Sequence, residues 1–215
     1  MNNFRKTISE VIEDRFGYGV ILGDNNGNLS KYLLNNWSGT LYMVVKEMIS
    51  TELWNNVGST DDYLERGLLL RMKSEQASML YEDDSLDFIY INTGYEYKET
   101  TEILSTWYPK IKAGGYMFGN NYLGSDKNWW YKSGDTKNKI IKIKGKEIGK
   151  FGVNPAVDEF SVDNDLDLFY SNSKQDWFGE WGFRKAKTTK PKKNSGFVQW
   201  RKELQNPDFE VNKSV

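Results

Sequence analysis

The chain of 215 residues contains neither cysteine nor histidine. Their absence excludes thiol nucleophiles, histidine general bases and zinc sites built on these side chains. Disulfide scaffolds are excluded for the same reason. A chain of this length buries roughly 70% of its unfolded surface, so it can fold without such cross-links.

The sequence also lacks an excess of charge of either sign and a long apolar run. Its 29 basic and 30 acidic residues give a formal net charge of −1, which argues against a nucleic-acid binder driven by overall charge. No segment approaches the roughly 20 apolar residues of a membrane span, and the first residues lead into no apolar signal segment. We therefore expect a cytoplasmic protein that does not act on membranes or nucleic acid.

Short apolar segments alternate with helical patterns along most of the chain. Their composition and length predict strands at residues 18–22, 40–45, 67–70, 86–91 and 116–118. The stripe from Ile103 to Ile111 predicts a helix that ends at Gly114-Gly115. Strands alternating with helices predict an α/β fold with a doubly wound, mostly parallel sheet.

The later part of the chain is different. Residues 124–150 interleave lysines with aromatic residues and predict an inserted flap or hairpin. Asn154-Pro155 predicts a helix start, with Asn as the cap and Pro at the first position. Two antiparallel closing strands are expected at 166–170 and 177–183. We predict one domain over residues 1–187, followed by a basic polar tail, 188–215, with a short helix at 197–204.

The loops at 23–28, 45–48, 92–97 and 119–124 all follow expected strands. In doubly wound sheets, ligands bind beyond the carboxyl ends of the strands. The convergence of these loops on one edge of the sheet predicts a binding site there.

Five short motifs occur in order, with sensible spacing. They are GVILGDNNGNLS at 19–30, SLDFIYINT at 85–93 followed by Tyr95-Glu96-Tyr97, WYPKIKAGG at 107–115, GNNY at 119–122 and GVNPAVDEF at 152–160. Together they resemble the class I S-adenosylmethionine-dependent methyltransferases, and within them the branch of macrocin O-methyltransferase and the cephalosporin hydroxylase-like proteins. The resemblance covers about residues 15–185 and implies a Rossmann-like sheet of seven strands with an antiparallel C-terminal strand.

The resemblance also implies S-adenosylmethionine as donor and a small polar acceptor, such as a sugar or glycoconjugate. The donor side would use Gly23, Gly27 and Ser30, with Asp24 or Glu47 near the ribose, since the family's acidic position falls at Val45. Asn92, Tyr95 and Asn120 would be the catalytic residues. The rest of the acceptor side would be lined by Asn121, Tyr122, Trp129 and Trp130.

The site positions have lost most of the charges that the family carries. Asn92, Asn120 and Asn121 stand where metal-dependent relatives have carboxylates, so Mg²⁺ is not expected, because hard dications favour carboxylates. Tyr95 stands at the family's histidine, and tyrosine is a poor base at its usual pKa near 10. The family's first-strand glutamate is Ile21.

Two hypotheses follow from these departures, and both remain open at the level of sequence. The first is an active methyltransferase that works by proximity, without metal or base. The second is a catalytically inactive binding or scaffold protein on the same fold. A homo-oligomer is compatible with either. Methylation of nucleic acid through the basic stretch 184–193 is the weaker third reading.

Overall fold

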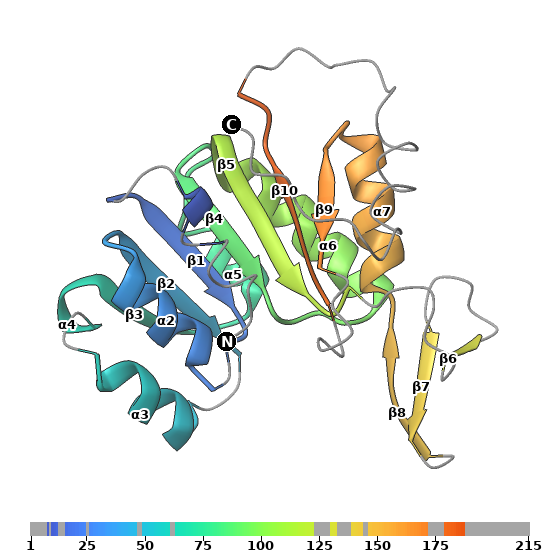
Figure 1. The fold of residues 1–215 in the computed structure, drawn as a ribbon, viewed down its shortest axis with the longest axis horizontal. Coiled ribbons are helices and arrows are strands. Elements are labelled where there is room, and N and C mark those ends of the chain that lie inside the picture. The colour runs from blue at the N-terminus through green and yellow to red at the C-terminus, as the bar shows by residue number, and fades with distance from the viewer. Residues whose placement is uncertain are drawn as a thin grey trace.

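The structure is a computed structural model that describes residues 8, 10–12, 16–24, 26–46, 49–60, 63–122, 130–132, 139–143, 146–171 and 179–187. Within this part, a large twisted sheet forms the centre of the molecule and carries helices on both sides (Figure 1).

The main sheet has seven strands in the order β3-β2-β1-β4-β5-β10-β9. Its parallel strands include β1 (Tyr18–Leu22), β2 (Thr40–Val45), β3 (Gly67–Arg71), β4 (Leu86–Ile91) and β5 (Ile111–Asn120). Strand β10 (Glu180–Arg184) runs antiparallel to both β5 and β9 (Leu168–Tyr170). The predicted doubly wound α/β sheet with an antiparallel C-terminal strand is therefore confirmed.

Side chains alternate between two cores, one on each face of this sheet. Helices α2 (Asn28–Asn36) and α3 (Thr51–Gly58) cover one face, where Ile21 is buried. Helices α5 (Ser74–Ser78), α6 (Tyr97–Trp107) and α7 (Val153–Asp163) cover the other, where Val20 and Leu22 are buried. Each fully buried aliphatic side chain stabilises the fold by roughly 2 kcal/mol, so β1 is held from both sides.

The predicted helix over 103–111 ends earlier than its apolar stripe suggested. Helix α6 ends at Trp107, and a 3-10 turn, η1 (Tyr108–Lys110), leads directly into β5 at Ile111. Pro109 lacks the backbone N–H that a continuing helix needs, so the stripe passes from helix to strand. The expected helix end at Gly114-Gly115 is wrong, because both glycines lie within β5.

Helix α7 begins two residues before Pro155. Gly152 occupies the cap position and Val153 the first turn, so the expected Asn154 cap with Pro155 at the first helical position is wrong. Pro155 still falls in the first turn, where its missing N–H leaves no helical hydrogen bond unmade.

The two closing strands are antiparallel as predicted, although shorter, at 168–170 and 180–184. Within 124–150, the structure describes β6 (Trp130–Lys132), β7 (Lys139–Ile143) and the start of β8 (Lys146–Phe151). They form a separate antiparallel sheet beside the main one (Figure 1). The tail 188–215, with its expected helix at 197–204, lies outside the described residues, and the domain boundary at 187 stays a prediction. Helix α4 (Tyr63–Arg66) precedes β3.

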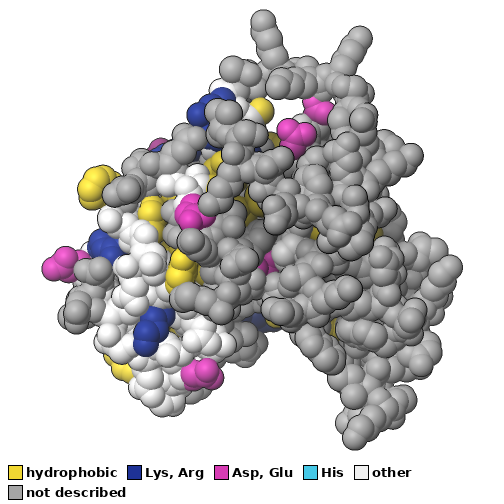
Figure 2. Space-filling model, in the orientation of Figure 1, with side chains coloured by type: hydrophobic (Ala, Val, Ile, Leu, Met, Phe, Trp, Pro, Cys, Tyr) yellow, Lys and Arg dark blue, Asp and Glu magenta, His cyan; other side chains and the backbone are white. Residues whose placement is uncertain are grey.

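The described surface carries charges of both signs. Figure 2 shows basic and acidic side chains scattered over the part of this face that is described, without a patch of one sign. In the same described part of the chain, no helix has the length and apolar character needed to cross a bilayer.

Candidate functional site

The glycine loop after β1 brings three strand ends together. Gly23 has a φ of +85°, and a Cβ built on it would lie 2.5 Å from the carbonyl oxygen of Asn92. Its N–H donates to the carbonyl of Val44 at 2.9 Å. Only glycine has both the backbone freedom and the small size for this position. Gly23 therefore joins the carboxyl ends of β1, β2 and β4.

Asp24 and Ser30 are both buried and bind each other. The Asp24 carboxylate accepts hydrogen bonds from the Ser30 amide at 2.8 Å and from the Ser30 hydroxyl at 2.6 Å. It thereby satisfies a free N–H in the first turn of α2, which begins after Gly27, itself at a φ of +72°. The polar groups of Asp24 and Ser30 thus face one another inside the loop, and neither residue lines the pocket described next.

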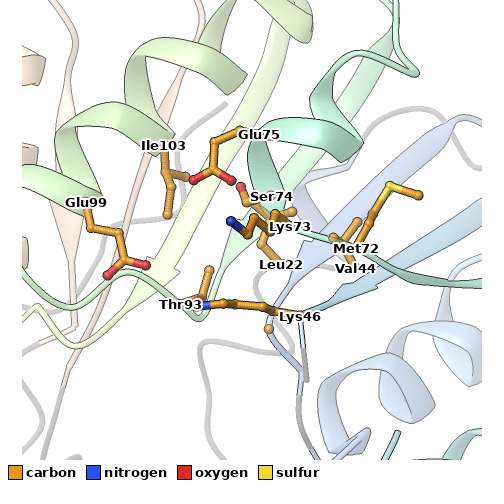
Figure 3. A pocket seen from close by; sticks show the side chains of 11 residues that line it. Leu22, Val44, Lys46, Met72, Lys73, Ser74, Glu75, Thr93, Glu99 and Ile103 are labelled. Carbon is orange, nitrogen blue, oxygen red and sulfur yellow. The ribbon is translucent and has the colours of Figure 1, made fainter. Parts of the chain in front are cut away.

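A pocket of about 360 Å³ opens beyond the carboxyl ends of β1 to β4, between these strand ends and helices α5 and α6 (Figure 3). Its size suits a small ligand. Of the described residues predicted to hold a donor, Gly23 lines it, whereas Asp24, Gly27 and Ser30 do not. The other described lining residues are Leu22, Val44, Lys46, Met72, Lys73, Ser74, Glu75, Thr93, Glu99 and Ile103.

Four charged side chains among the described residues line this pocket. Lys46 and Lys73 come from the ends of β2 and β3, whereas Glu75 and Glu99 come from α5 and α6. Figure 3 shows Lys46 extending along the pocket toward Thr93. Within the described residues, none of the four forms an ion pair. Their charged groups are therefore available to a ligand.

At the end of β2, Val45 occupies the position where the resemblance places an acidic residue, and its side chain does not line the pocket. Side chains alternate along a strand, so Val44 faces the pocket, while Val45 is 3% exposed and packs in the opposite core with α2 and α3. The residue that follows, Lys46, returns to the pocket. Glu47, the predicted substitute for the acidic residue, lies outside the described residues.

Asn92, Asn120 and Asn121, which the sequence predicted at the acceptor side, form a chain of hydrogen bonds. Asn92 Nδ2 donates to the Gly23 carbonyl at 3.2 Å, Asn120 Nδ2 donates to Asn92 Oδ1, and Asn121 Nδ2 donates to Asn120 Oδ1 at 2.8 Å. Asn121 has a φ of +61°, a conformation that asparagine tolerates better than most residues. This amide chain, defined by Asn92, Asn120 and Asn121, links the ends of β1, β4 and β5.

An amide chain of this kind has different chemistry from a carboxylate cluster. Each amide both donates and accepts, so neighbouring amides satisfy one another, which two carboxylates cannot do. In the described part of the molecule, no three acidic side chains lie close enough together to share a metal ion. The chain positions polar groups at the strand ends without carrying charge.

Tyr95 lies beside the amide chain, and its hydroxyl donates to the Asn92 carbonyl at 3.4 Å. Burial raises the pKa of Tyr95, a hydrogen bond with the Asn121 side chain opposes this, and the Glu99 carboxylate adds to the rise. The phenol is therefore protonated at neutral pH and can donate a hydrogen bond, but it cannot act as a base there.

Of the other predicted acceptor-side residues, Tyr122 has a described side chain. The hydroxyl of the buried Tyr122 donates to an Asp158 carboxylate oxygen of α7 at 2.5 Å. Trp129 lies outside the described residues, and Trp130 is placed only as part of strand β6. The structure thus brings Asn92, Tyr95, Asn120 and Asn121 together and ties Tyr122 to helix α7.

Sequence reasoning missed most of the pocket's lining. The signal for Lys46 was its place immediately after a predicted strand, and Thr93 lay within a loop that was already singled out. The signal for Lys73, Ser74 and Glu75 was weak, because the five residues of α5 are too few to show a helical period.

No protein-family model matches the sequence, and no curated protein is significantly similar to it. Solved structures do resemble it. A SAM-dependent methyltransferase from Methanosarcina mazei has a TM-score of 0.62 and 12% identity, over 83% of this chain and 97% of the other. A methyltransferase from Geobacter sulfurreducens has a TM-score of 0.57 and 10% identity, over 86% and 79%. For an O-methyltransferase family protein from Burkholderia thailandensis, the values are 0.62 and 11%, over 86% and 55%. The chain therefore has the class I methyltransferase fold.

Proposed function

We propose that this protein is an S-adenosylmethionine-dependent O-methyltransferase that acts on a small polar acceptor, such as a sugar or glycoconjugate. The observation that carries the proposal is the pocket beside the Gly23 loop, at the point where the sheet order reverses between β1 and β4. In doubly wound sheets this is where nucleotide-like ligands bind. The structural neighbours support a methyl donor as that ligand.

The pocket fits such a donor in both size and character. Leu22, Val44, Met72 and Ile103 provide apolar walls for a base, and Thr93 offers a hydroxyl. Glu99 and Glu75 provide negative charge toward an ammonium or sulfonium group, and the Lys46 ammonium can donate to ribose oxygens. When bound, the donor supplies an activated methyl group on a sulfonium.

On the acceptor side, the proposed role of the protein is positioning. The amide chain and the Tyr95 hydroxyl offer neutral hydrogen-bonding groups at the ends of β4 and β5, next to the pocket through Gly23. Holding an acceptor oxygen in line with the methyl group supplies much of the rate enhancement of such a transfer. A carbohydrate acceptor and the macrocin O-methyltransferase branch rest on the sequence motifs, and Mg²⁺ has no role in this proposal.

The neutral amide chain favours a second candidate, a binding protein that has kept the pocket and lost methyl transfer. Its asparagine side chains hydrogen-bond one another and the Gly23 carbonyl, so fewer polar atoms remain for an acceptor. Donor binding alone does not separate the two candidates, whereas turnover does.

The first test is isothermal titration of the protein with S-adenosylmethionine, in EDTA and again in Mg²⁺. We expect micromolar affinity that does not change with the metal. Thr93→Phe should block the pocket and abolish the heat of binding, while the matched control Val162→Phe, on an exposed position of α7, should bind normally. Absence of binding by the wild-type protein in both buffers would overturn the proposal.

The second test is transfer of a labelled methyl group from the donor to a panel of sugars and hydroxylated glycoconjugates. Label in the acceptor that is lost in Thr93→Phe and kept in Val162→Phe supports the enzyme. Donor binding without transfer to any acceptor of the panel favours the binding protein.

A further inference from the structure

The charge at the carboxyl end of β2 has a specific meaning in doubly wound sheets. An acidic residue at this point accepts hydrogen bonds from a free ribose diol, whereas a basic residue accommodates a phosphate on the ribose. Among the described residues, the charged side chain that lines the pocket at this point belongs to Lys46, and the preceding Val45 is buried in the opposite core.

A second lysine lines the same pocket. Lys73 follows β3, which is the strand adjacent to β2 in the sheet. Neither lysine has a carboxylate partner within the described residues. Both ammonium groups line the pocket and form no ion pair within the described residues, so each is suited to bind an anion through charge-assisted hydrogen bonds.

We propose that this pocket also binds adenine nucleotides whose ribose carries a phosphate, in competition with the methyl donor. The proposal rests on the nucleoside pocket of the proposed function, but not on methyl transfer. The phosphate lies toward Lys46 and Lys73, and the base packs against the apolar walls. Either a 2′- or a 3′-phosphate has the required chemistry, and the two are separated by experiment.

The acidic residues of the pocket limit which phosphates are expected to bind. Glu75 and Glu99, from α5 and α6, balance the two lysines, so the described lining residues carry no net charge. Long-range attraction for anions is therefore small, and recognition depends on where the phosphate is attached. A phosphate at the 5′ position or free in solution gains little from this arrangement.

The test is titration with adenosine, 2′-AMP, 3′-AMP, 5′-AMP and inorganic phosphate. We expect 2′-AMP or 3′-AMP to bind about tenfold more tightly than adenosine, the size of effect given by one hydrogen bond to a charged group. 5′-AMP should remain within about threefold of adenosine, and inorganic phosphate should show no heat. Equal affinities for adenosine and both ribose phosphates would overturn the inference, as would equal gains for 5′-AMP.

Variants locate the effect. In Lys46→Ala, the ratio between ribose-phosphate and adenosine affinities should fall to near one, and Lys73→Ala should reduce it in part. The matched control is Lys98→Ala, because Lys98 lies on the exposed side of α6, with a side chain 88% exposed, and this variant should keep the full ratio. A ratio that persists in the Lys46→Ala, Lys73→Ala double variant would overturn the inference. Thermal melts establish that each variant is folded.

This design separates the inference from the proposed function. If S-adenosylmethionine binds and the ribose phosphates have no advantage, the inference fails and the proposed function stands. If the ribose phosphates bind and S-adenosylmethionine does not, the proposed function fails and the inference stands only as a nucleotide site. Displacement of bound S-adenosylmethionine by 2′-AMP or 3′-AMP supports both.

Discussion

Two neighbouring regions meet at Gly23 and use polar side chains in opposite ways. In the pocket region, lined by residues of β1 to β4, α5 and α6, Lys46, Lys73, Glu75 and Glu99 carry charges that pair with nothing in the described chain. In the amide chain, neutral side chains hydrogen-bond one another.

The two regions should contribute to different properties: the pocket to ligand affinity, and the amide chain to the stability of the fold. Unpaired charges around a cavity add little to folding and are free to bind a ligand. Paired amides at strand ends hold those ends together, and their loss leaves polar atoms without partners. Substitutions in the pocket should therefore change binding, whereas substitutions in the amide chain should change stability.

The largest effect is expected at Asp24, a buried residue of the loop after β1 whose carboxylate accepts two hydrogen bonds from Ser30. Asp24→Ala leaves the buried amide and hydroxyl of Ser30 without their acceptor, so the free energy of unfolding should fall by about 2–3 kcal/mol. Urea denaturation followed by circular dichroism measures this. Asp163→Ala, at the exposed end of α7, is the control. An unchanged urea midpoint in Asp24→Ala would contradict the role given to this loop.

The next effect tests the neutrality of the amide chain. Asn120→Asp replaces a donor with an oxygen facing Asn92 Oδ1, which should lower the free energy of unfolding by about 1–2 kcal/mol in EDTA. Mg²⁺ should restore part of it, because a carboxylate is a far better ligand than an amide. The wild-type protein and the exposed control Asn164→Asp should not respond to Mg²⁺. A variant as stable as wild type in EDTA would show that the amide chain does not contribute to the free energy of unfolding.

A smaller effect is expected from Tyr95 in alkaline solution. Burial raises the pKa of Tyr95 above its ordinary value near 10, so the folded state favours the neutral phenol. This contribution is complete below pH 10 and is lost as the pH rises through the higher pKa of the folded protein. Tyr95→Phe should therefore lose less stability than wild type between pH 9 and pH 11, measured by urea midpoints. Parallel losses would remove Tyr95 from this account.

The smallest effect should come from the pocket. Glu75→Gln and Lys73→Met each remove a charge that forms no ion pair within the described residues, and the free energy of unfolding should change by less than about 0.5 kcal/mol. The same urea assay at neutral pH measures it. A loss above about 1 kcal/mol from either variant would mean that these charges stabilise the fold, and the contrast with the amide chain would disappear.

Sequence reasoning reached the sheet because its strands are short apolar runs between turn-forming residues, and β1 and β2 were predicted with their observed bounds. It failed at residues 107–115, where one apolar stripe serves first a helix and then a strand, and where Pro109 decides the boundary. The spacing of apolar residues does not show where a helix ends and a strand begins.

The sequence predicted which loops form the site, but not which side chains line the pocket. The loops after β1, β4 and β5 do converge, and the three asparagines lie together as expected from strand ends. Lys46 faces the pocket because side chains alternate along β2. Lys73 reaches the pocket because β3 lies beside β2 in the sheet. Neither can be obtained without the sheet order. The engagement of Asp24 by Ser30 is likewise a three-dimensional fact.

Lys185 has a consequence for the order in which the molecule is completed during synthesis. Directly after β10, its ammonium group donates to Asp84 Oδ1 at 2.7 Å and to the Ile111 carbonyl at 2.6 Å. Both partners belong to segments made much earlier, as do the strands that bury Trp181 and Phe183. A nascent chain that has produced β1 to β5 still exposes part of its core to solvent. The core can close only after β10 has left the ribosome.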